Sequence, residues 1–313
     1  MKLIVQIPCL NEEATLPATV RDIPRSIDGI DNVEILVIDD GSSDRTVAVA
    51  RELGVEHIVR FRQNRGLAAA FSAGLDASLR LDADIIVNTD GDNQYAGSDI
   101  SKLVAPILSE QADIVIGDRQ IDTIPHFSTT KKRLQRLGSW VVRQASDTDI
   151  PDTTSGFRAY SREAAMRLNV VSDYSYTLET IIQAGKQRLA LTHVPVGTNP
   201  VTRESRLFSS LPGYLRRSGE TIVRIYTMYQ PLRVFVIAGL ILLFGGFLLS
   251  LRYVYFVTQG EGTGHVQSVI IAAVLLIAGF QVILIGLLAD LIAVNRRLSE
   301  DILLRVKRLR HDG

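Results

Sequence analysis

Two aspartates separated by one glycine are the residues of this chain with the clearest potential for chemistry. Asp90, Gly91 and Asp92 follow a short apolar run at 85–87, and Gln94 comes two residues later. In an extended segment residues i and i+2 point the same way, so these oxygens can converge on one hard cation. The pattern predicts an Mg²⁺ or Mn²⁺ site that holds a nucleotide diphosphate. A plain strand-to-loop turn is the competing interpretation, because Asp, Gly and Asn all favour turns.

The segments around this pair alternate between strand-like and helix-like patterns. Strands are expected at 3–7, 33–38, 57–62, 85–87 and 114–117, and helices at 11–20, 46–53, 67–80 and 100–108. Such an α/β succession predicts a mostly parallel sheet with helices on both faces. Ligands bind at the carboxyl ends of the strands in these sheets. The polar clusters that directly follow strands should therefore meet at one edge; they lie at 8–12, 39–46, 90–94 and 117–119.

Composition excludes several classes of protein. Lys+Arg and Asp+Glu both total 34 in the 313 residues, so the net charge predicts no nucleic-acid partner. The single cysteine, Cys9, rules out an intrachain disulfide framework and a cysteine-rich metal site. No glycine-rich dinucleotide motif and no P-loop motif is present. The first apolar run is too short for a signal peptide, so the first domain is expected to stay in the cytoplasm.

Two long apolar runs at 234–257 and 266–294 each exceed the roughly 20 residues that span a bilayer as a helix. Basic residues gather before the first run and after the second, whereas the loop at 258–265 has no Lys or Arg. The positive-inside rule then predicts a multi-pass protein of the cell membrane with the large domain and both termini in the cytoplasm. Glycines within the runs allow close helix packing, which leaves a homo-oligomer open.

These features divide the chain into four expected parts. A cytoplasmic domain at 1–206 is followed by juxtamembrane helices at 207–232, two transmembrane helices at 233–295 and a basic cytoplasmic tail at 296–313. Arginines alternate with apolar residues in the juxtamembrane part, which is typical of amphipathic helices on an anionic membrane surface. A solvated helical linker is the alternative.

Four motifs give the chain a family resemblance over about residues 1–206. They are Pro8-Cys9-Leu10-Asn11-Glu12-Glu13, Val37-Ile38-Asp39-Asp40-Gly41-Ser42-Ser43-Asp44-Arg45-Thr46, Asp90-Gly91-Asp92-Asn93-Gln94 and Ser155-Gly156-Phe157-Arg158. In order and spacing they resemble the family 2 glycosyltransferases, whose GT-A fold is a Rossmann-like nucleotide-sugar-binding domain. The dolichol-phosphate mannose synthases and polyprenyl-phosphate glycosyltransferases are the most similar subgroup.

The resemblance implies a role for each matching position. The residues expected to bind the donor are Pro8, Leu10, Glu12, Ile38, Asp40, Asp90, Gly91, Asp92, Arg119 and Arg206. The metal ligands would be Asp90, Asp92 and Gln94. Asp92, Arg119 and Asp152 would be catalytic, with Asp152 as a base or an acceptor-orienting group and a structural cap as the alternative.

Two departures from the family pattern affect the expected donor site. Leu10 stands where a tyrosine is common, so base stacking there loses its support. Arg206 replaces a lysine in a Gly-Glu-Ser-Lys segment whose glycine is Arg203 here. A guanidinium keeps the charge but presents a fork instead of a point.

The resemblance implies that a sugar moves, with inversion, from UDP or GDP to an undecaprenyl or dolichyl phosphate. The cation would act as a Lewis acid on the leaving diphosphate, and Arg119 and Arg206 would donate where charge develops. Basic and apolar residues alternate at 125–143, which predicts that this segment lies on the membrane and captures the lipid phosphate. Its key cations are Lys131, Lys132, Arg133 and Arg136. A solvated helix face is the alternative.

Two other functions compete with this one. A processive polysaccharide synthase would carry a Gln-x-x-Arg-Trp motif, but the only tryptophan, Trp140, lacks that context. A non-catalytic membrane scaffold that retains a nucleotide-sugar fold would be marked by a broken metal motif. Both aspartates are present, which favours an enzyme.

Overall fold

The computed structural model describes residues 1–120, 139–143, 146–171, 176–199, 219–220, 223–224, 226–260 and 262–311. The chain forms two compact units. The first comprises Met1–Ile222 and Leu304–Gly313, and the second comprises Val223–Leu303. Arg206, the basic positions at 131–136 and most of the expected juxtamembrane helices lie outside the described residues.

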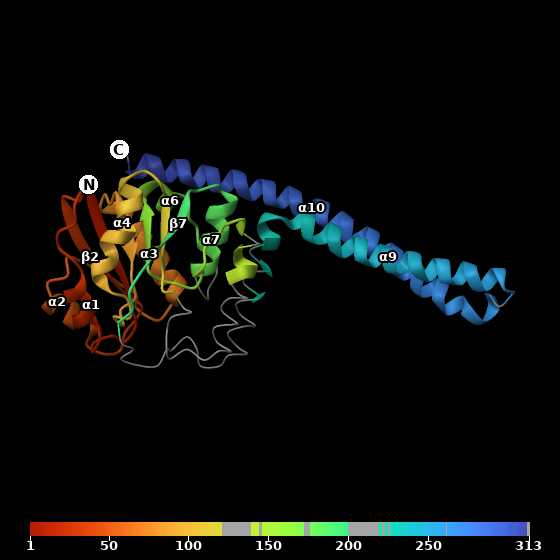
Figure 1. The fold of residues 1–313 in the computed structure, drawn as a ribbon, viewed down its shortest axis with the longest axis horizontal. Helices are drawn as coiled ribbons and strands as arrows, with labels where there is room; N and C mark the ends of the chain where they lie inside the picture. The colour runs from red at the N-terminus through yellow and green to blue at the C-terminus, as the bar shows by residue number, and fades with distance from the viewer. Residues whose placement is uncertain are drawn as a thin grey trace. The chain divides into compact units, whose positions relative to one another are not determined.

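The first unit is built on a seven-stranded sheet with the order β3-β2-β1-β4-β6-β5-β7 (Figure 1). Its strands are β1 (Lys2–Cys9), β2 (Asn32–Asp39), β3 (His57–Arg60), β4 (Ile85–Asn88), β5 (Ile114–Asp118), β6 (Arg158–Ser161) and β7 (Leu191–Pro195). All neighbouring pairs are parallel except those of β6, which runs antiparallel to β4 and β5. The predicted α/β fold with a mostly parallel sheet is confirmed, and β6 is the exception that the sequence patterns did not predict.

Helices cover both faces of the sheet. They are α1 (Leu16–Asp22), α2 (Thr46–Glu52), α3 (Leu67–Arg80), the short η1 (Gly97–Asp99), α4 (Ile100–Leu108), α6 (Arg162–Arg167) and α7 (Tyr176–Lys186). Alternate residues of β1, such as Leu3 and Val5, pack with α1 and α4 in one core. On the opposite face Phe71 of α3 stacks on Tyr176 of α7 with ring centroids 3.8 Å apart. Because both faces are covered, the central strands are apolar without alternation.

The first helix begins later than its sequence pattern suggested. Asn11 has a φ of 54°, in the left-handed region, so it cannot open an α-helix. Its side-chain oxygen instead accepts a hydrogen bond from the backbone N–H of Ser43, at 2.8 Å. The residues from 10 to 15 therefore form a turn that is tied to the loop after β2, and the α1 helix starts only at Leu16.

The second unit contains α9 (Pro231–Thr258), η4 (Gly262–His265) and most of α10 (Val266–His311) (Figure 1). A Cβ placed on Gly239 would lie 2.8 Å from the Gly279 carbonyl oxygen, and one on Gly246 would lie 3.0 Å from that of Ala272. Small residues thus let the two helix backbones touch, as in membrane helix pairs. Large apolar side chains point outward, among them Ile241 at 66% exposure and Leu288 at 62%. Both helices are long and apolar enough to cross a membrane, which indicates membrane association.

Candidate active site

The predicted metal loop follows β4 directly. β2, β1 and β4 are neighbours in register, with Cys9 beside Asp39 and Gln6 beside Asn88, so their carboxyl ends lie at one edge. Gly91 lies against the turn after β1, because an added Cβ would be 3.1 Å from Cys9 Sγ and 3.3 Å from Glu12 Cγ. The structure therefore brings these three polar clusters together at one edge, and the charge of Arg119, from the fourth cluster after β5, also acts on Asp90.

Asp90 is wedged against Gly156, the residue two positions before β6. A Cβ at Gly156 would lie 3.0 Å from Asp90 Oδ1 and 3.0 Å from the Tyr176 hydroxyl. Burial, together with the charge of Asp92, raises the pKa of Asp90 to about 7, although the charges of Arg119 and Arg158 oppose this shift. Two carboxylates in such a setting repel each other, and a divalent cation would relieve that repulsion.

Gln94 lies beside the second carboxylate. Its side-chain amide donates to Asp92 Oδ2 at 2.9 Å, and its backbone N–H donates to Asp92 Oδ1 at 3.2 Å. Within the described ranges, no group of three or more His, Cys, Asp or Glu could hold a metal ion. The donor set of two carboxylates and one amide nevertheless fits Mg²⁺ or Mn²⁺, which often complete their shells with water and substrate phosphates.

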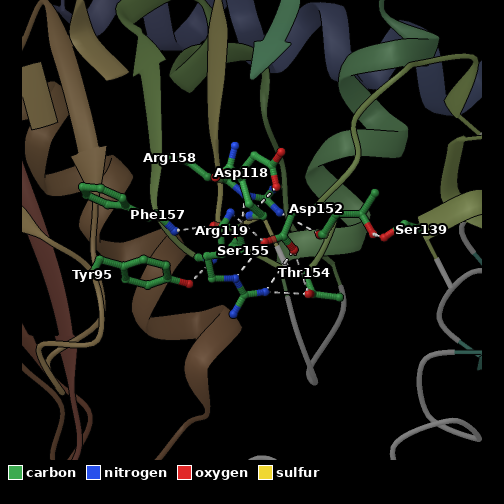
Figure 2. Close-up of polar contacts among 12 residues, drawn as sticks. Tyr95, Asp118, Arg119, Ser139, Asp152, Thr154, Ser155, Phe157 and Arg158 are labelled. Atoms are coloured by element: carbon green, nitrogen blue, oxygen red, sulfur yellow. Dashed lines mark hydrogen bonds and ion pairs between the residues drawn. The ribbon is translucent and has the colours of Figure 1, made fainter. Parts of the chain in front are cut away.

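Arg119 follows β5 and is held by Asp152 (Figure 2). Its Nε donates to Asp152 Oδ2 at 2.7 Å, and its Nη2 donates to Asp152 Oδ1 and to Thr154 Oγ1, both at 2.9 Å. Figure 2 shows the third nitrogen, Nη1, directed away from the carboxylate. It has no hydrogen-bonding partner among the residues that the structure describes, so it is available to a ligand.

Asp152 does not have the properties of a catalytic base. Its side chain is 1% exposed, and both of its oxygens accept hydrogen bonds from Arg119. Burial alone would raise the pKa of Asp152, but the charge and hydrogen bonds of Arg119 outweigh burial and lower it. A base needs a pKa near the working pH and access to a proton. The geometry therefore makes Asp152 a positioning residue for Arg119 and argues against a base, which is one of the roles that the family resemblance implied.

The expected nucleotide-binding residues form two groups: polar residues in the loops at the edge of the sheet, and an apolar residue buried in the core. Glu12 accepts a hydrogen bond from Thr15 Oγ1 at 2.7 Å. Asp40 accepts from the backbone N–H groups of Arg65 at 2.7 Å and Gly66 at 2.9 Å, so it fixes the loop before α3. Ile38 belongs to the other group, because its side chain is fully buried against Gly74 of α3. Its predicted contact with the donor is not supported.

The two other apolar positions expected at the donor lie at the carboxyl end of β1. Pro8 is buried and pairs in register with Ile38, whereas Leu10 is partly exposed just beyond the strand. Leu10 can therefore present its side chain at the edge where Glu12 and the loop of Asp90 meet. Pro8 can offer a donor only its backbone.

Asn88 belongs to a polar network that sequence reasoning missed. It accepts from the Gln6 side chain at 2.9 Å and donates to the Gly156 carbonyl and the Tyr176 hydroxyl, both at 2.8 Å. The network ties β1, β4 and α7 together beneath the metal loop. Gln6 and Asn88 could have been noticed, since each is a polar residue in an apolar strand.

Asn199, which is distant in sequence, forms hydrogen bonds to the metal loop. Its side-chain amide donates to the carbonyl oxygens of Asn93 and Tyr95 at 3.1 and 3.2 Å, and its backbone N–H donates to that of Gln94 at 2.9 Å. No local pattern in the sequence marks this residue, because its partners lie about a hundred positions earlier.

The fold is that of a glycosyltransferase of the GT-A type, and comparison with known proteins specifies the family. The model of glycosyl transferase family 2 matches residues 4–168, just over half of the chain, and a second model, the GtrB C-terminal hairpin, matches residues 230–294. The chain belongs to glycosyl transferase family 2. It is a glycosyltransferase with a GT-A domain and a C-terminal pair of apolar helices.

Similar proteins include enzymes that are named for lipid-phosphate acceptors. The UDP-N-acetylglucosamine–dolichyl-phosphate N-acetylglucosaminyltransferase of Methanococcus voltae is 30% identical over 61% of this chain and 83% of its own length. The polyprenol monophosphomannose synthase of Mycolicibacterium smegmatis is 29% identical over 62% of this chain and 76% of its own length.

A solved structure supports the fold. The glucosyl-3-phosphoglycerate synthase of Mycobacterium tuberculosis, in complex with Mn²⁺, UDP and glucosyl-3-phosphoglycerate, superposes with a TM-score of 0.56 at 22% identity. The match covers 72% of this chain and 78% of that one.

Proposed function

We propose that this protein transfers a sugar from a UDP- or GDP-linked donor to a polyprenyl phosphate, with inversion, at the cytoplasmic face of the cell membrane. One observation carries the proposal: Asp152 fixes Arg119, whose charge acts on Asp90, in a chain that also bears two membrane-length helices. The relatives named for dolichyl and polyprenol phosphates support the acceptor class.

The site residues have distinct tasks in this reaction. A bound Mg²⁺ or Mn²⁺, held by Asp90, Asp92 and Gln94, would supply Lewis-acid chemistry at the donor diphosphate. Arg119 Nη1 donates to an oxygen on which negative charge develops, and the rigid ion pair with Asp152 keeps that donor aimed. Preorganisation of this kind lowers the cost of reaching the transition state.

The acceptor class also agrees with the state of Asp152. A hydroxyl acceptor needs a base to remove its proton, whereas a phosphate monoester is already anionic near neutral pH. The carboxylate that the sequence suggested as a base is committed to Arg119. A lipid phosphate does not require a free base at this position.

The membrane arrangement rests on the distribution of charge. Basic residues flank the two apolar helices on the side of the catalytic domain and tail, which supports cytoplasmic placement of both. Capture of the lipid phosphate by Lys131, Lys132, Arg133 and Arg136 stays a prediction from the sequence.

The proposal is tested with the purified full-length chain in lipid nanodiscs. Radiolabelled UDP- and GDP-sugars are supplied one at a time with Mg²⁺ or Mn²⁺, undecaprenyl or dolichyl phosphate, and 3-phosphoglycerate in a parallel reaction. We expect one donor to give label that extracts into organic solvent. Label on phosphoglycerate alone, or donor binding without any lipid product, would overturn the proposed acceptor.

A further inference from the structure

Arg158 is a fully buried cation that the mechanism does not use. Its side chain has no exposed surface, and it is the largest of the buried side chains described. Four hydrogen bonds surround its guanidinium, and all four acceptors are neutral oxygens. Within the described part of the chain no carboxylate pairs with it. Because burying a charge is costly, such a residue needs a specific reason to be there.

The four bonds join one loop to one helix. On the loop side, Nη2 donates to the Thr153 carbonyl at 2.9 Å and Nε donates to the Ser155 carbonyl at 2.7 Å. On the α7 side, Nη1 donates to the Thr177 carbonyl at 2.9 Å and to Thr180 Oγ1 at 2.8 Å. Figure 2 draws Arg158 together with Asp152, Thr154 and Ser155 of this loop. The guanidinium fork therefore braces the loop against the helix.

The braced loop is the one that holds Arg119. The two carbonyls that Arg158 grips flank Thr154, whose Oγ1 accepts from Arg119 Nη2. Asp152, which accepts two hydrogen bonds from Arg119, is next to the first gripped residue. Any shift of this loop would move both partners of Arg119 together.

The strand register gives Arg158 a second relation to the site. In the sheet it pairs with Asn88 of β4 on one side and with Ile116 of β5 on the other. Asn88 lies two residues before Asp90, and Ile116 lies three residues before Arg119. Arg158 thus stands between the strand that carries the metal loop and the strand that carries the arginine.

We propose that Arg158 is a positioning residue of the transferase, which aims Arg119 at the donor by bracing the carbonyl oxygens of Thr153 and Ser155. It does not touch substrate, since its side chain is fully buried. The kinetic test of this role rests on the proposed function, whereas the effect of Arg158 on the loop can be measured without any substrate.

A double-mutant cycle tests whether Arg158 acts through Arg119. The variants are Arg158→Lys, Arg119→Gln and the double variant, with kcat and KM measured for the donor sugar and the lipid. We expect Arg158→Lys to lower kcat by about tenfold in the wild-type background and by less than about twofold once Arg119 is replaced, because residues that act as a unit are non-additive. Equal factors in both backgrounds, or no loss in either, would overturn the proposal.

Arg162→Lys is the matched control. Arg162, unlike Arg158, is only partly buried; it donates to the Ala83 carbonyl at 3.1 Å, and its Nη2 lies 3.7 Å from Asp82 Oδ1. We expect its kcat to stay within about twofold of the wild type, since surface-proximal pairs contribute little. If Arg158→Lys does not fold, Thr180→Val removes one of the four acceptors and takes its place in the cycle.

Hydrogen exchange separates failure of this proposal from failure of the proposed function. In Arg158→Lys, amides of the peptide covering 150–157 should exchange at least about tenfold faster than in the wild type, whereas Arg162→Lys should leave them unchanged. This readout needs no substrate. If the wild type transfers no sugar but Arg158→Lys still loses protection in this peptide, the proposed function is refuted and the brace is retained. Unchanged protection refutes the brace.

Discussion

The guanidinium of Arg119 and the carboxylate of Asp152 form a two-pronged ion pair, with Nε–Oδ2 and Nη2–Oδ1 distances of 2.7 and 2.9 Å. The pair is buried on the carboxylate side and leaves one nitrogen of the arginine for a ligand. A bidentate pair fixes direction as well as distance. Asp152 therefore fixes the orientation of the Arg119 guanidinium in addition to balancing its charge.

Replacement of Asp152 should test this pair directly. Asp152→Asn leaves Arg119 buried without its counter-charge, which should lower the free energy of unfolding by about 3–5 kcal/mol. Urea denaturation monitored by circular dichroism measures this loss. The matched control is Asp147→Asn, since Asp147 pairs with Lys186 but its side chain is 73% exposed. That control should lose no more than about 1 kcal/mol.

The same pair predicts a dependence of stability on pH. Because the folded-state pKa of Asp152 is lowered, its contribution is complete above the unfolded value of about 3.9 and is lost as the pH falls through the lower folded value. The stability gap between wild type and Asp152→Asn should be full at pH 7 and should shrink below about pH 4. A gap that stays constant down to pH 2.5 would argue against the ion pair as its source.

Metal binding should depend on both aspartates of the loop after β4. Asp92→Asn should weaken Mn²⁺ binding by at least about tenfold, because a carboxylate ligand is replaced by a neutral amide. Electron paramagnetic resonance of free Mn²⁺, with and without UDP, measures the affinity independently of catalysis. The control is Asp28→Asn, because Asp28 is exposed and far from Asp92 in the sequence. Chelation of the metal should abolish transfer, and added Mg²⁺ or Mn²⁺ should restore it.

Gly156 should tolerate no side chain. The Cβ of Gly156→Ala would lie 3.0 Å from both Asp90 Oδ1 and the Tyr176 hydroxyl, so the carboxylate must move. We expect a loss of about 1–3 kcal/mol in stability from overpacking, together with weaker Mn²⁺ binding. Gly197→Ala is the control, since its nearest neighbours would be 3.5 Å away. If Gly156→Ala binds Mn²⁺ as the wild type does, Asp90 is not a ligand in this position.

Asn199 should matter for the metal loop although it is distant in sequence. Asn199→Ala removes the two side-chain hydrogen bonds to Asn93 and Tyr95, each of which contributes about 0.5–1.5 kcal/mol. Faster hydrogen exchange should appear in the peptide that covers 89–96, along with an increased KM for the donor. Unaltered exchange there would show that the loop holds its shape without the clamp.

Much of the donor edge was predictable from the sequence because it is built from parallel strands. Each strand from β1 to β5 runs toward the site, so the polar residues that follow it mark the edge. β6 runs the opposite way, and its contribution comes from the residues just before it, where Gly156 lies. A sequence search restricted to the residues that follow each strand therefore does not identify Gly156 as part of this edge.

Other parts of the site depend on contacts that leave no local pattern. Asn199 and Tyr176 find their partners through strand pairing and helix packing across 88 to 106 residues. Ile38 was expected at the donor because its motif places it near Asp40, but its side chain is fully buried against Gly74 of α3, a packing contact that the motif does not reveal. For Asp152, expected as a base or an acceptor-orienting group, the sequence contains no sign of its partner Arg119, which is 33 residues away.

The helix pair of the second unit has a consequence for how such enzymes can diversify. The site contacts described here all lie between residues 6 and 199, whereas the glycine-lined contact of the second unit joins α9 to α10. In the proposed function, an ion and a nucleotide constrain the first set, whereas the thickness and packing of a bilayer constrain the second. Natural variation can thus replace the anchor without redesigning the catalyst, so one transfer chemistry can be carried into membranes of different composition.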